Sequence, residues 1–100
     1  MEVTAWKGGT YGIRVGKNNV RQYFVSGTKS VDVEIDGHVY AFPLSSTFWT
    51  TCPEFRGKPV GAWLRKNNLI PWPKRQPPKL KLLLLGNNTF RLTLNREQNY

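Results

Sequence analysis

The sequence predicts an α+β domain that is mostly β with two short helices, arranged as a small antiparallel β-barrel or pseudobarrel. One hundred residues can form a single core, and a chain that is 39% hydrophobic and 13% aromatic is too apolar for a disordered one. Two hairpin signals then favour a closed or strongly bent sheet. We expect five or six strands in one domain spanning residues 1–100, with residues 95–100 as a frayed tail.

The first hairpin signal lies between residues 30 and 44. Apolar and acidic residues alternate over residues 31–35, and Asp36-Gly37 follows as a two-residue turn whose two positions both need a positive φ. Pro43 has no N–H to donate to a ladder, so it ends the second strand or confines it to a sheet edge. A separate strand is expected over residues 10–15.

Helical signals are shorter. Residues 18–24 place apolar side chains at helical spacing after an asparagine, which predicts a short helix or a basic loop. A second helix begins at Lys58-Pro59, because proline suits the first helical turn, and Asn67-Asn68 provides its left-handed end. A single helical turn is expected over residues 47–51.

A proline-rich segment separates this helix from the second hairpin. Residues 69–79 hold four of the seven prolines and therefore form an extended connector. Residues 80–85 and 89–94 flank Gly86-Asn87-Asn88 and predict the second hairpin.

The compartment follows from what the sequence lacks. One cysteine allows no internal disulfide, which favours a reducing environment. No N-terminal stretch has the form of a secretory signal, and the apolar run at residues 82–85 is far shorter than a membrane helix. We expect a cytoplasmic protein with no membrane partner.

Charge is distributed unevenly along the chain. The net charge is +9, and the stretch between Phe55 and Asn95 holds nine basic residues and no acidic one. A second acid-free stretch runs from Val3 to Val31, while three acids gather at residues 32–36. Solubility alone needs a smaller and more mixed charge. The pattern therefore favours a surface that binds a polyanion.

No pattern points to catalysis, a metal or a cofactor. His38 is the only histidine, and one histidine with one cysteine cannot fill a tetrahedral metal site without two carboxylates. Asp32 and Glu34 share a strand face but lack the companion lysine of a metal-dependent nuclease, so they are expected on the solvent side. Cys52 is expected to be a buried or half-buried structural thiol rather than a nucleophile.

Two basic segments, residues 14–22 and 65–68, also carry amide side chains. Such residues contact phosphates and base edges, although paired asparagines are also ordinary turn formers. We predict that these segments project as two arms that straddle a duplex. The predicted nucleic-acid-binding residues are Arg14, Lys17, Asn18, Asn19, Arg21, Arg65, Lys66, Asn67, Asn68, Trp72, Lys74 and Arg75.

The tryptophans divide by context. Trp49 and Trp63 lie on helical faces and are expected in the core. Trp72 lies between two prolines and precedes Lys74-Arg75. It either stacks on a base while these cations hold phosphates, or it pins the connector to the body of the domain.

Residues 47–80 carry the pattern F-W-x-x-C-P-E-x-R, then W-L, W-P-K and P-P-K. This pattern resembles small bacterial proteins of no assigned activity, some of them on mobile gene cassettes, and implies a bacterial origin. More loosely, the order of elements is similar to the DNA-binding pseudobarrel of plant transcription factors and of some restriction endonucleases. That resemblance implies DNA in a concave groove between two arms, here Arg14–Arg21 and Arg65–Arg75, although no diagnostic motif of the fold is present.

These observations predict a non-enzymatic nucleic-acid-binding module that prefers duplex DNA to RNA. The alternative is a protein-interaction or accessory module. It would use Trp72 and the connector, or the open strand edge at Pro43, to bind an acidic protein or a second copy of the chain.

Overall fold

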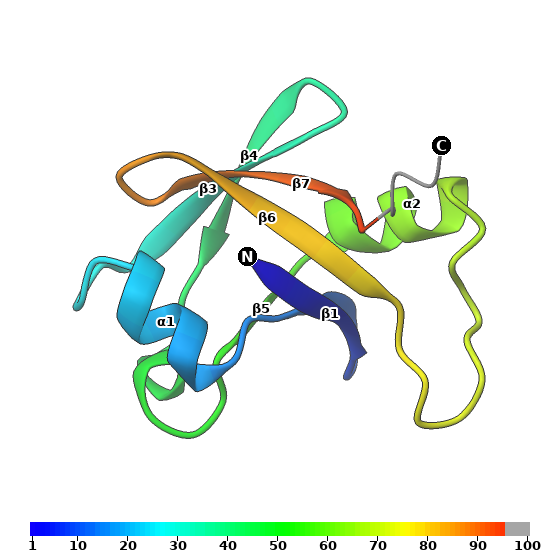
Figure 1. Cartoon of the computed structure of the whole chain (residues 1–100), viewed down its shortest axis with the longest axis horizontal. Helices are drawn as coiled ribbons and strands as arrows, with labels where there is room; N and C mark the ends of the chain where they lie inside the picture. The colour runs from blue at the N-terminus through cyan, green and yellow to red at the C-terminus, as the bar shows by residue number, and fades with distance from the viewer. Residues whose placement is uncertain (96–100) are drawn as a thin grey trace.

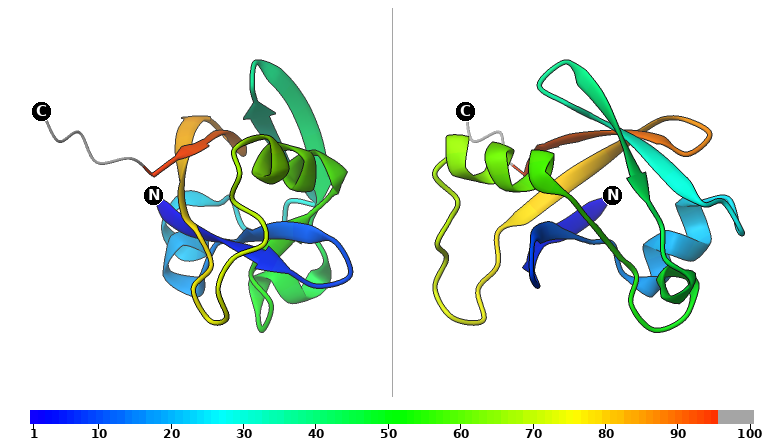
Figure 2. Two further views of the ribbon diagram at one scale, coloured as in Figure 1. Left: turned by 90° about the vertical axis from the view of Figure 1, so that its right-hand side faces the viewer. Right: turned by 180° about the vertical axis from the view of Figure 1, so that it is seen from behind.

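The structure is a computed structural model that describes residues 1–95. Its elements, in chain order, are β1 (Glu2–Lys7), β2 (Tyr11–Arg14), α1 (Lys17–Tyr23), β3 (Ser30–Ile35), β4 (His38–Pro43), the 3₁₀ helix η1 (Ser46–Trp49), β5 (Glu54–Arg56), α2 (Lys58–Lys66), β6 (Lys79–Gly86) and β7 (Thr89–Leu94). The helices α1 and α2 lie at opposite ends of the molecule (Figures 1 and 2).

All seven strands belong to one sheet, in the order β4-β3-β7-β6-β1-β2-β5. Neighbouring strands are antiparallel except β3 and β7, which are parallel. The two end strands meet through Phe42 of β4 and Phe55 of β5, whose ring centroids are 5.1 Å apart. The sheet is therefore nearly closed into a small barrel, which confirms the predicted class. The number of strands is seven, and the expected five or six was wrong.

Both predicted hairpins are present. Asp36 and Gly37 have φ values of 52° and 84°, as the two-residue turn between β3 and β4 requires. Pro43 ends β4, which is an edge strand. In the β6–β7 hairpin, Asn88 takes the left-handed position with φ 55°.

Two strands were missed by sequence analysis, β1 and β5. β1 buries only Val3 and Ala5, and β5 has three residues with Phe55 alone in the core. Segments with so few inward residues give a weak alternation signal. They become strands because β1 pairs with β2 and β6, and β5 pairs with β2.

The core lies between the sheet and the two helices. Its fully buried side chains include Ile13, Val33, Leu80 and Phe90. The predicted helix at Lys58 is α2, which buries Val60, Trp63 and Leu64 on one face. It ends at Lys66, and Asn68, two residues later, has a φ of 58°. The segment that was either helix or loop is α1, and it buries only Val20.

Two predictions about burial were wrong. Cys52 is exposed, because the inward positions of its segment fall on Pro53 and Phe55. Trp49 is only half-buried, with its ring edge-on to Phe48 at 5.0 Å, whereas Trp63 is buried as expected.

At the C-terminus, residues 96–100 of the expected frayed tail lie outside the described residues. Asn95, its first residue, is held, because its side-chain amide donates to a carboxylate oxygen of Glu2 at 3.0 Å. Within residues 1–95, no helix has the length and apolarity to cross a membrane.

Candidate nucleic-acid interface

The outer face of β1, β2 and β5 carries aromatic and cationic side chains in register. Trp6 of β1 lies opposite Gly12 of β2, which lies opposite Arg56 of β5. Because successive strand residues point to opposite faces, the neighbouring rung of Ala5, Ile13 and Phe55 enters the core and leaves Trp6 and Arg56 outside.

Gly12 lets these strands come close together. A Cβ at residue 12 would lie 2.4 Å from the carbonyl oxygen of Phe55, so no side chain fits between Trp6 and Arg56. The Arg56 guanidinium therefore reaches across Gly12 and sits 5.5 Å from the centroid of the Trp6 ring. The Trp6 ring also covers Gly8, where a Cβ would lie 2.4 Å from it. Two glycines and one arginine thus fix the position of this indole.

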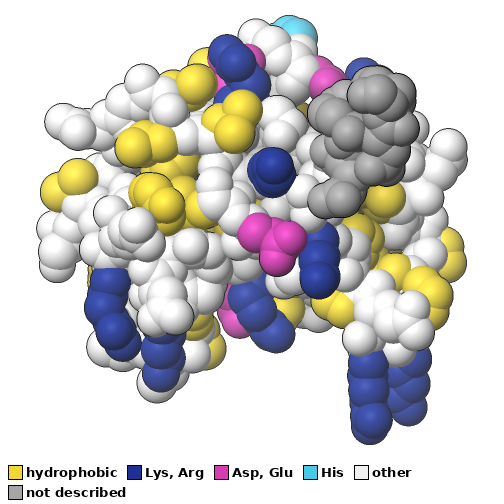
Figure 3. Space-filling model, in the orientation of Figure 1, with side chains coloured by type: hydrophobic (Ala, Val, Ile, Leu, Met, Phe, Trp, Pro, Cys, Tyr) yellow, Lys and Arg dark blue, Asp and Glu magenta, His cyan; other side chains and the backbone are white. Residues whose placement is uncertain are grey.

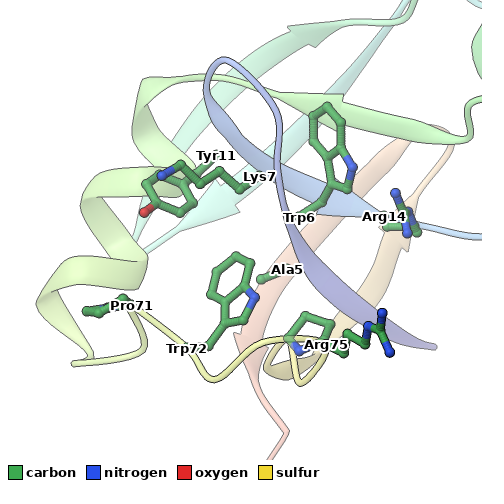
Figure 4. Close-up of a pocket in the computed structure, with 9 residues that line it drawn as sticks. Ala5, Trp6, Lys7, Tyr11, Arg14, Pro71, Trp72 and Arg75 are labelled. Carbon is green, nitrogen blue, oxygen red and sulfur yellow. The ribbon is translucent and has the colours of Figure 1, made fainter.

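A pocket of about 450 Å³ opens between β1, β2 and the connector (Figure 4). Its walls include the rings of Trp6, Tyr11 and Trp72. Trp72 meets Tyr11 edge-on, with centroids 5.8 Å apart, and packs against the core. The connector is therefore pinned by Trp72, as one interpretation of the sequence expected. The indole is partly buried and lines the pocket, where a ligand can contact it.

The same pocket gathers cations. Arg14 and Arg75 reach it from the same side in Figure 4, and Lys7 reaches it from the other. The Lys7 ammonium lies 5.4 Å from the centroid of the Tyr11 ring. Lys7 and Arg75 have no carboxylate within 4 Å among residues 1–95, whereas Arg14 pairs with Glu54 at 3.1 Å.

Two further hollows are lined by residues of the strands, η1 and α1. One, of about 560 Å³, shares Trp6 with the first and reaches Thr47 of η1. The other, of about 170 Å³, lies on α1 and η1 and is lined by Lys17, Arg21 and Trp49. A discontinuous track of aromatic and cationic side chains thus leads from the connector to α1. We call it the basic track, defined by Lys17, Arg21, Arg56, Trp6, Lys7, Trp72, Lys74 and Arg75.

Figure 3 shows where lysine and arginine side chains gather on one face of the molecule. Cationic side chains project from the lower margin in two groups, one beneath α1 and one at the tip of the connector, and the outline is concave between them. α1 carries Lys17 and Arg21, and the connector tip carries Lys74 and Arg75.

Ion pairing leaves most of the positive charge available. Within residues 1–95, the cations that lie within 4 Å of a carboxylate are Arg14 with Glu54, Lys66 with Asp36, and Arg91 with Glu34. The last two carboxylates belong to the β3–β4 hairpin, as does Asp32, so most of the described acids lie apart from the basic track.

The predicted binding residues fall into three places. Arg14, Trp72 and Arg75 line the first pocket, with Lys74 beside them in the sequence. Lys17 and Arg21 lie on α1, and Asn18 is exposed on the same helix. The third group is at the end of α2, where Arg65 is exposed and Lys66 is 2.8 Å from Asp36.

The asparagines of the predicted arms have structural partners. The Asn19 amide donates to the carbonyls of Glu2 and Val15, both at 2.9 Å. The Asn67 amide donates to the Trp63 carbonyl at 2.9 Å, and Asn68 holds the left-handed end of α2. These contacts agree with the alternative interpretation of the sequence, in which the asparagines form turns and helix ends rather than contacts with nucleic acid.

The binding residues predicted from the sequence do not include Trp6, Lys7, Tyr11 or Arg56. Their proximity depends on β1 and β5, the two strands that were missed. One feature of the sequence could have indicated these contacts. Gly8 and Gly12 lie near aromatic residues, and a glycine inside a strand often marks a place where another backbone comes close.

Within residues 1–95, no three His, Cys, Asp or Glu side chains form a group that could hold a metal ion. His38 is exposed on β4, with Tyr40 as its aromatic neighbour at 6.5 Å. No protein-family model, curated protein or solved structure matches the chain.

Proposed function

We propose that this protein is a non-enzymatic module that binds nucleic acid along the basic track, with duplex DNA as its preferred ligand. The observation that carries the proposal is the set of unpaired cations and partly buried aromatic rings that line the hollows of the basic track. Neutralisation of phosphates by lysine and arginine supplies much of the affinity of such proteins, and a cation that is not already paired with a carboxylate is free to make such a contact.

Geometry supports a duplex as the ligand. Two cationic groups border a concave margin in Figure 3, so they can meet phosphates on either side of a rounded surface. The longest extent of the described fold is 37 Å, close to one turn of B-DNA, about 34–36 Å. A single domain can therefore contact the backbone over about one turn.

Removing charge from the two ends of the basic track tests this proposal. In fluorescence anisotropy with a 20-base-pair duplex at low salt, the double variants Lys17→Ala/Arg21→Ala and Lys74→Ala/Arg75→Ala should each bind clearly more weakly than the wild type. The matched control is Lys66→Ala/Arg91→Ala, which also loses two charges but from side chains paired with Asp36 and Glu34. Equal weakening in all three variants would mean that only net charge matters, and the proposal would be wrong.

A second candidate function, a protein-interaction module, rests on the free edge of β4. Val39 is 60% exposed and Tyr40 is 36% exposed on this edge strand, and Leu83, Leu84 and Leu85 are also exposed on β6. An unpaired strand edge can accept a strand from another chain. Sedimentation of the wild type should then show a dimer that Val39→Lys converts to a monomer, and a monomer at all concentrations would remove self-association.

A further inference from the structure

The pocket beside Trp72 differs from the other two hollows in that three aromatic residues line it, Trp6, Tyr11 and Trp72, together with two prolines. Its volume of about 450 Å³ lies within the range of small-molecule sites, about 300–1,000 Å³. Trp6, Tyr11 and Trp72 supply aromatic walls, and Pro71 and Pro77 add rigid apolar ones. Flat apolar walls with cations at the rim match the chemistry of a nucleobase joined to a phosphate.

The backbone at the rim is also unusual. The N–H of Gln76 donates to the Pro73 carbonyl at 2.9 Å and closes a turn in which Arg75 occupies the third position. Arg75 has a φ of 65°, in the left-handed region that favours glycine or asparagine. A turn alone would be more stable with glycine there. Arginine at this position places a guanidinium at the mouth of the pocket, and residues in such conformations are concentrated at functional sites.

We infer that this pocket takes one unpaired nucleobase, stacked on Trp72, while Arg75 and Lys7 hold the flanking phosphates. The ligand class is a nucleic acid that carries an unstacked base, such as a bulge, a flipped nucleotide or a single-stranded end. This inference rests on the proposed function and adds a base-recognition site to it. A base inside an intact duplex stays stacked between its neighbours, so only an extruded base reaches Trp72.

The test compares three DNA ligands on the wild-type protein by fluorescence anisotropy. The ligands are a perfect 20-base-pair duplex, the same duplex with a single bulged thymidine, and the same duplex with a bulged abasic site. The two bulged ligands carry equal numbers of phosphates and differ only in the base. Stacking of one base on an aromatic ring is expected to make the thymidine bulge bind roughly 5- to 150-fold more tightly than the abasic bulge.

The outcomes separate this inference from the proposed function. Tighter binding of the thymidine bulge than of the abasic bulge supports the base pocket. Equal binding of all three ligands would overturn the base pocket but leave the nucleic-acid module standing. No binding of any ligand at low salt would overturn both.

Two variants test whether the preference for the thymidine bulge over the abasic bulge arises at Trp72. Trp72→Leu keeps an apolar contact for Tyr11 but removes the flat ring, so it should lower the ratio of thymidine-bulge to abasic-bulge affinity to about one. Trp49→Leu removes a half-buried indole outside this pocket and should leave that ratio unchanged. A ratio that persists in Trp72→Leu, or that falls equally in Trp49→Leu, would place base recognition elsewhere. Because the ratio is also measured on the wild type, the test does not depend on the stability of either variant.

Discussion

Gly12 shows how one residue organises the candidate site. It lies between Trp6 and Arg56 on the outer face of the sheet, and its missing side chain lets the guanidinium reach the indole. The sequence shows this glycine plainly, but its neighbours across the sheet depend on β1 and β5. Cys52 was predicted to be buried because aromatic residues lie near it in the sequence. The inward positions of its segment are instead occupied by Pro53 and Phe55, so Cys52 is exposed.

Gly12→Ala should destabilise the fold by about 1–3 kcal/mol, because the new Cβ would lie 2.4 Å from the Phe55 carbonyl oxygen, a backbone atom of the neighbouring strand. Urea denaturation measures this change. Gly9→Ala is the matched control, since nothing lies within 4 Å of its Cβ position, and it should change stability by less than about 0.5 kcal/mol. Similar values for the two variants would contradict the close approach of β2 and β5.

Arg75→Gly should separate folding from binding. Relief of the left-handed conformation, about 1–2 kcal/mol, offsets the extra chain entropy of glycine, about 0.5–1 kcal/mol, so stability should stay the same or rise slightly. The slope of log affinity against log salt for a duplex should become shallower by about 0.9 because one phosphate contact is lost. Arg75→Lys keeps the charge and should preserve the slope. A loss of stability in Arg75→Gly would contradict this account of the turn.

Elements with strong turn signals were predicted well from the sequence. Asp36-Gly37 and the segment at Gly86 each joined two strands as expected, and Lys58-Pro59 began a helix. β1 and β5 could not be predicted in this way, since each is a strand only because its neighbours pair with it. Closure of the barrel also depends on β5, because Phe55 of β5 contacts Phe42 of β4.

Phe42→Ala should therefore cost about 3–5 kcal/mol of folding stability, since Phe42 is 2% exposed and joins the two end strands. Guanidinium denaturation gives the value. Val39→Ala on the same strand is the control, and its 60% exposure predicts a change within about 0.5 kcal/mol. A small effect at Phe42 would mean that the contact between β4 and β5 contributes little to the fold.

At the scale of the whole molecule, the excess of positive charge was easier to predict from the sequence than the positions of the charged side chains in the fold. Most lysines and arginines of the two acid-free stretches have no carboxylate within 4 Å among residues 1–95. The sequence did not indicate that Lys66 would lie beside Asp36, or that Lys7 would line one pocket together with the connector. Such contacts join residues far apart in the chain, and local patterns do not contain them.

The central claim is that the unpaired cations of the basic track bind phosphates together. The most direct measurement is the affinity of the wild-type protein for a 20-base-pair duplex across a series of salt concentrations. The six cations of the basic track, Lys7, Lys17, Arg21, Arg56, Lys74 and Arg75, predict a slope of log affinity against log salt of about −5. A slope near zero, or no binding at low salt, would contradict the claim.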